Sequence, residues 1–153
     1  MHIEDNSYPS PHDNSQRKKT LKKLIEEAIK DEILDSEYFS LLSDVISDSQ
    51  DKHTILNIRM DEEKHQNLLG GLYSMLTGNN PPEYTPEDVN ISENIPQELY
   101  SKIINKTDSV DFYTRLLSNL TERGIRDILI EIISDEAIHA DLLNALFSKY
   151  KVN

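Results

Sequence analysis

Apolar residues recur at helical spacing in four segments of the chain, while the period-two alternation typical of strands is weak. Residues that favour helix ends flank these segments: Ser47, Asp48 or Ser49 before the second, Gly78 after it, Pro96 at the start of the third and Thr121 before the fourth. The pattern therefore predicts an all-α protein with helices over about residues 17–47, 50–77, 96–119 and 122–150.

The connections between these helices differ sharply in length. The first and third are short, so each should close an antiparallel helical hairpin. The middle one, "GNNPPEYTPEDVNISEN", has seventeen residues and could span roughly 55 Å when extended. A helix of about 26 residues is only about 39 Å long. We therefore predict a four-helix bundle over residues 17–153, with one long crossover and a flexible tail at residues 1–16.

The motif Asp-Glu-x-x-His occurs twice, each time followed by two leucines after two intervening residues. Glu62 and His65 belong to the first copy, and Glu136 and His139 follow at the same offset of 74 positions. Several apolar positions repeat at this offset, so the chain resembles a duplicated hairpin.

Each Glu-x-x-His lies within an apolar stripe whose steps alternate between three and four residues. In the first hairpin, antiparallel pairing brings Glu32 level with Glu62. In the second it brings Lys106 level with Glu136. Buried carboxylates that face one another are unstable unless a cation lies between them. We therefore expect a buried polar centre with a positive charge in it.

Charge and composition exclude several classes of protein. The formal net charge is −12, with 28 acidic and 16 basic residues, which argues against a nucleic-acid binder because no basic stripe is available for phosphates. There is no cysteine, no apolar run as long as a membrane span and no signal-peptide pattern in "MHIEDNSYPSPHDNS". We expect a soluble, cytoplasmic protein that does not associate with a membrane.

With two Glu-x-x-His motifs, a single glutamate and a long crossover, residues 17–150 resemble the ferritin-like, rubrerythrin-related di-iron carboxylate bundles. "IRMDEEKHQNLLGGLYSMLTG" and "DILIEIISDEAIHADLLNALF" are similar to the second and fourth helices of small bacterial members. The resemblance implies that Glu62 and Glu136 bridge two metal ions, that His65 and His139 bind one ion each, and that Glu32 is a terminal ligand.

The resemblance also suggests roles for neighbouring residues. Asp61 and Asp135 resemble the acids that orient ligand histidines, although solvated acids beside the stripe explain them equally well. Tyr113 could approach the centre, or it could be an ordinary core aromatic.

Lys106 departs from the family pattern, which has a glutamate at this position. An ammonium cannot bind a metal ion, so the expected charge of the centre falls to that of three carboxylates and one lysine. We consider three arrangements: one remaining metal position, a metal-free core in which Lys106 replaces the cation, or two metals with Lys106 bent away. A lysine that extends out of the bundle to solvent would also remove the ligand.

The leading functional hypothesis is a metal-binding protein of iron handling or oxidative stress. Carboxylates with two histidines suit iron or manganese; we expect iron, and manganese, zinc or no metal remain alternatives. An enzyme of this kind would be a rubrerythrin-like oxidoreductase, a peroxidase or a ferroxidase. It would need an external electron donor, because rubredoxin-like cysteines are lacking.

Two rival hypotheses stand beside it: a structural or interaction bundle without redox chemistry and, less favoured by the charge, a DNA-protecting cage. The family resemblance implies a homodimer.

Overall fold

The computed structural model describes residues 14–86 and 88–151. Of the tail expected at residues 1–16, all but the last three residues lie outside this description. Those three residues belong to the first helix rather than to a tail.

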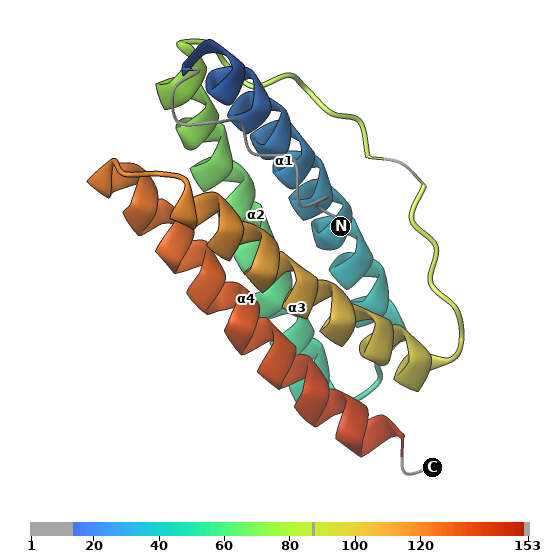
Figure 1. The fold of residues 1–153 in the computed structure, drawn as a ribbon. Helices are drawn as coiled ribbons and strands as arrows, with labels where there is room; N and C mark the ends of the chain where they lie inside the picture. The colour runs from blue at the N-terminus through green and yellow to red at the C-terminus, as the bar shows by residue number, and fades with distance from the viewer. Residues whose placement is uncertain (1–13, 87, 152–153) are drawn as a thin grey trace.

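The described part of the chain contains four α-helices and no strand (Figure 1). They are α1 (Asn14–Val45), α2 (Ser49–Thr77), α3 (Ile95–Ser118) and α4 (Arg123–Tyr150). α1 and α2 form one antiparallel hairpin, and α3 and α4 form the other. The predicted all-α four-helix bundle is confirmed.

The helix ends follow local hydrogen bonding. The Asp48 carboxylate accepts bonds from the backbone N–H groups of Gln50 and Asp51 and so caps α2. Gly78 ends this helix with φ 72°, in the left-handed region that glycine adopts without strain. The expected cap at Thr121 is wrong: α4 starts one residue later, after Glu122, whose side chain makes no capping bond.

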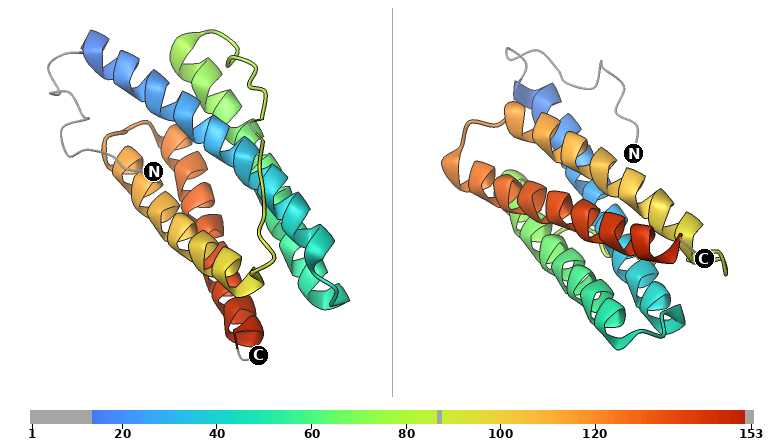
Figure 2. Two further views of the ribbon diagram at one scale, coloured as in Figure 1. Left: turned by 90° about the vertical axis from the view of Figure 1, so that its right-hand side faces the viewer. Right: turned by 90° about the horizontal axis from the view of Figure 1, so that it is seen from below.

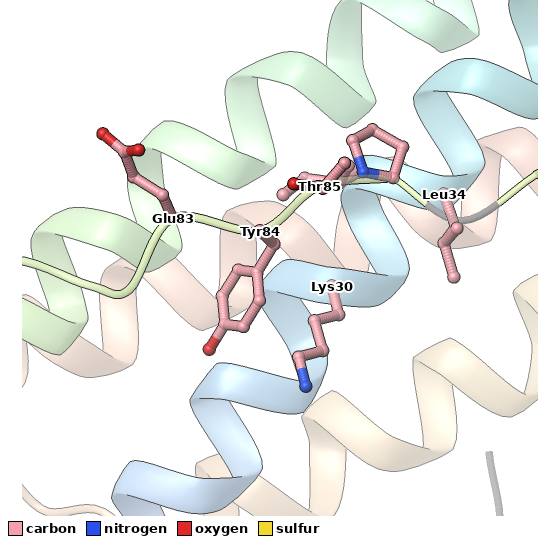
Figure 3. A pocket seen from close by; sticks show the side chains of 7 residues that line it. Lys30, Leu34, Glu83, Tyr84 and Thr85 are labelled. Atoms are coloured by element: carbon pink, nitrogen blue, oxygen red, sulfur yellow. The ribbon is translucent and has the colours of Figure 1, made fainter.

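The crossover runs along the outside of α1, from the end of α2 to the start of α3 (Figures 1 and 2). Between the crossover and α1 lies a pocket to which Lys30 and Leu34 contribute from the helix and Glu83, Tyr84 and Thr85 from the crossover (Figure 3). The Lys30 ammonium lies 4.9 Å from the centre of the Tyr84 ring, a cation–π contact that fastens the crossover to the helix.

The apolar core is divided into two clusters. One contains Ile25, Leu69, Tyr113 and Leu129, and the other contains Phe39, Ile55, Leu99 and Leu143. Buried polar side chains separate them. The two hairpins approach each other most closely along α2 and α4. α1 and α3 are linked instead by long side chains, such as the Tyr38 hydroxyl that donates to Glu98 at 2.7 Å.

Candidate metal centre

Five of the predicted site residues meet between the two apolar clusters. They come from α1, α2 and α4 and are at most 3% exposed: Glu32, Glu62, His65, Glu136 and His139. The expected buried cluster of acids and histidines is therefore present. Each Glu-x-x-His brings its two side chains to the same face because residues three apart lie one turn apart on a helix.

The two histidines are held in the same way. His65 places Nδ1 3.2 Å from Glu136 Oε1, and His139 places Nδ1 3.0 Å from Glu62 Oε1. The opposite nitrogen of each ring contacts an aspartate of the other hairpin: His65 Nε2 lies 2.9 Å from Asp135, and His139 Nε2 lies 2.8 Å from Asp61. Such a contact fixes the ring and directs the Nδ1 atom toward the centre.

Lys106 is fully buried and points into the centre. Its Nζ lies 2.9 Å from Glu62 Oε2 and 3.0 Å from Glu136 Oε2. The arrangement with Lys106 bent away is therefore wrong, and so is the one in which it extends to solvent. Two carboxylates at ion-pair distance outweigh the gain in hydration that solvent would offer.

Sequence reasoning missed Asp35. Its carboxylate is 3.0 Å from Lys106 Nζ through one oxygen and 2.7 Å from Lys102 Nζ through the other. Asp35 stands three residues after Glu32, on the same side of α1, and the two lysines are four apart on α3. This matched spacing allows Asp35 to meet both lysines, provided that α1 and α3 lie level and face each other. The centre holds four carboxylates beside Lys106, not the three that we expected.

Tyr113 contacts the centre directly. Its hydroxyl donates a 2.7 Å hydrogen bond to Glu32 Oε1, which leaves Glu32 Oε2 facing His65 Nδ1 at 3.5 Å. Tyr113 therefore holds one oxygen of Glu32 and leaves the other free to bind a ligand.

Burial and ion pairing separate the pKa values of the glutamates. Burial raises the pKa of Glu32 to about 7 and that of Glu62 well above its usual range. Burial has the same tendency at Glu136, but the Lys106 ammonium and the two histidines outweigh it and hold its pKa well below the usual range. Among the three glutamates, Glu136 is thus the one that most firmly keeps its negative charge.

The cationic groups keep their charge despite burial. Contacts with Glu136 and Glu62 raise the pKa of His139 to about 9, against the effect of burial. Asp35 and the glutamates likewise raise the pKa of Lys106 well above that of a free lysine. A charged ammonium is therefore a stable part of the centre.

The donor atoms suit one metal ion. Glu32, Glu62, His65 and Glu136 each offer a ligand atom, and these four atoms lie within 4.8 Å of one another. Two ligands on opposite sides of an ion with bonds of about 2.1 Å are about 4.2 Å apart, so a small contraction would complete the shell. Buried donors that make no hydrogen bond include Glu32 Oε2 and His65 Nδ1. A second ion does not fit beside the first, because Lys106 Nζ lies against both Glu62 and Glu136.

The fold and this centre define a class: four-helix bundles of the ferritin-like type with a buried carboxylate and histidine cluster. The family model of rubrerythrin matches residues 23–147, and the chain belongs to the rubrerythrin family. A solved structure, a hypothetical protein from Pyrococcus furiosus, has the same fold with a TM-score of 0.74. It is 23% identical, over 84% of this chain and 88% of that one.

No curated protein matches the sequence. Among the described helices, none is both long enough and apolar enough to cross a membrane.

Proposed function

We propose that the protein binds one divalent metal ion, with iron as the natural occupant, through Glu32, Glu62, His65 and Glu136. The observation that carries this proposal is the convergence of four buried donor atoms within 4.8 Å of one another. A core without a ligand would be more stable with apolar residues at these positions. Carboxylate oxygens with a single imidazole also suit manganese, and zinc is less favoured.

The chain's own groups would prepare this ion site. Tyr113 orients Glu32, and Asp135 orients His65 through its Nε2 atom. The two apolar clusters exclude bulk water from both sides. A bound iron ion would supply one-electron redox chemistry, and the family suggests a role in iron handling or oxidative stress with electrons from an external donor. We further expect a homodimer located in the cytoplasm, which light scattering and cell fractionation would test.

Metal analysis with a matched pair of variants tests the proposal. The protein is purified without metal, loaded anaerobically with Fe(II) or Mn(II), and analysed for bound metal per chain. We expect one ion for the natural chain, none for His65→Gln, and one for His139→Gln. The last variant changes the equivalent residue of the other hairpin, which is not needed for the first ion. A natural chain that takes up no ion contradicts the proposal.

The ion pairs of Lys106 favour a second candidate: a metal-free structural or interaction bundle in which the ammonium supplies the positive charge. Under this alternative, neither metal nor EDTA changes the free energy of unfolding of the natural chain. Lys106→Glu would then acquire ions and ferroxidase activity that the natural chain lacks.

A further inference from the structure

Three carboxylate oxygens from three helices converge on one point of the centre. Asp35 Oδ2 of α1, Glu62 Oε2 of α2 and Glu136 Oε2 of α4 lie 3.0, 2.9 and 3.0 Å from Lys106 Nζ. Lys106 itself comes from α3, so all four helices contribute. A set of three carboxylates around a single point is a cation site by its chemistry.

A buried histidine lies against the other oxygen of Glu62. His139 Nδ1 is buried and lies 3.0 Å from Glu62 Oε1, whereas Lys106 contacts Glu62 Oε2. His139 is not one of the four residues proposed above to hold the metal ion. His139 therefore holds one oxygen of Glu62 while the other faces Lys106.

We propose that Asp35, Glu62 and Glu136 form a second cation site whose permanent occupant is the Lys106 ammonium. This inference rests on the proposed function, because it explains why the centre takes one exchangeable ion rather than two. It makes Asp35 and Lys106 the residues that determine the number of ions bound.

Asp35 makes the ammonium a stable occupant. Glu62 and Glu136 belong also to the proposed ion site, so Asp35 is the carboxylate that Lys106 does not share with the metal. Lys102 binds the other oxygen of Asp35 at 2.7 Å and lies over the Tyr38 ring at 4.3 Å. These contacts fix the Asp35 carboxylate with one oxygen toward Lys106.

The ammonium and a second metal ion exclude each other. The N···O distances of 2.9–3.0 Å around Lys106 are those of charged hydrogen bonds. A metal ion at the same point would draw the oxygens to about 2.1 Å. Shortening Lys106 to alanine removes the ammonium and leaves the three carboxylates around the space that it occupied.

Loading three variants with Mn(II) tests this inference. Bound manganese is counted by elemental analysis, and electron paramagnetic resonance reports whether two manganese ions are magnetically coupled. We expect one ion in the natural chain, two coupled ions in Lys106→Ala, and one ion in Lys106→Ala with Asp35→Asn. Asp35→Asn alone should still take a single ion, because Lys106 remains in the centre.

Each outcome bears on the inference. One ion in Lys106→Ala, or two in the double variant, overturns it. If Lys106→Ala does not fold without metal, refolding in Mn(II) decides: folding coupled to uptake of two ions supports the inference, and failure to fold overturns it. No ion in the natural chain but two in Lys106→Ala would reject the proposed function and leave this second site standing.

Discussion

The two hairpins present nearly the same residues to the centre, but they differ at one pair of equivalent positions, which carry opposite charges. Glu62 and His65 are repeated as Glu136 and His139, and each histidine contacts the glutamate and the aspartate of the other hairpin. At the next pair of equivalent positions, the first hairpin has Glu32 and the second has Lys106. A duplicated scaffold thus holds one anionic and one cationic side chain at matching depths.

The neighbouring aromatic residues differ in a way that fits this charge difference. Tyr113 of the second hairpin donates a hydrogen bond to Glu32 of the first. Phe39, its equivalent in the first hairpin, turns its ring toward Lys106 Nζ at 5.5 Å. A hydroxyl suits a carboxylate, whereas a ring face suits an ammonium. The comparison teaches that each of these two buried charges is matched by an aromatic side chain of the opposite hairpin.

The largest expected effect on stability comes from removing the positive charge of Lys106. Lys106→Met keeps the bulk of the side chain but leaves three carboxylates without their counter-charge. We expect a loss of about 3–5 kcal/mol in the free energy of unfolding, measured by urea denaturation at neutral pH in EDTA. Lys102→Met, one turn away and partly exposed, should lose about 1 kcal/mol. Equal losses in both variants would refute the special role of Lys106.

The pH dependence of the metal-free protein tests how the histidines are charged. The pKa of His139 is raised to about 9 from an unfolded value of about 6.5. Its contribution is therefore complete below pH 6.5 and is lost as the pH rises through 9. The raised pKa values of Glu32 and His65 act in the same direction.

We expect the free energy of unfolding in EDTA to fall by on the order of 2 kcal/mol between pH 6.5 and 9. Urea denaturation across this range measures the slope. His139→Gln should flatten it. A stability that is constant or rises over the range would show that the histidine is neutral in the folded protein.

The tyrosine on the anionic side should contribute less. Tyr113→Phe removes the hydroxyl that satisfies Glu32 Oε1 in the interior. We expect a loss of about 1–2 kcal/mol, because a buried acceptor is left without a partner. Tyr38→Phe is the matched control: its partner Glu98 is nearer the surface and is also bound by the Ser92 N–H, so its loss should be below about 1 kcal/mol. The reverse order in thermal or urea unfolding would contradict this assignment.

The smallest effect on stability is expected at Lys64, a partly exposed residue beside the centre. Lys64 lies 2.6 Å from Asp135 and is 40% exposed, while the equivalent position of the other hairpin is the apolar Ile138. Lys64→Ala should change the free energy of unfolding by about 0.5 kcal/mol at low salt and by less in 1 M NaCl. A loss that salt does not reduce would indicate that Lys64 acts through packing instead.

Much of the scaffold was legible in the sequence because it depends on local rules. The stripes containing Glu62 and Glu136, the stop at Gly78 and the length of the crossover all follow from helical geometry. The level of Glu32 and Lys106 followed from antiparallel pairing within each hairpin.

What was missed depends on how one hairpin lies against the other. Asp35 lies on α1 and Lys106 on α3, two helices of different hairpins. Predicting their contact requires the rotation and the axial shift of α1 relative to α3. The crosswise contacts of His65 with Asp135 and of His139 with Asp61 require the same information for α2 and α4. Local periodicity contains neither quantity, so the direction of the Lys106 side chain stayed open until the structure fixed it.

The crossover has a practical consequence. It lies outside the bundle, along α1, so the two hairpins could be produced as separate polypeptides by a break within it. Each fragment would then carry only some of the charged side chains of the centre, and these would be exposed to water until the two fragments associate. The affinity between the two fragments would then report how strongly the charges and any bound ion of the centre hold the hairpins together.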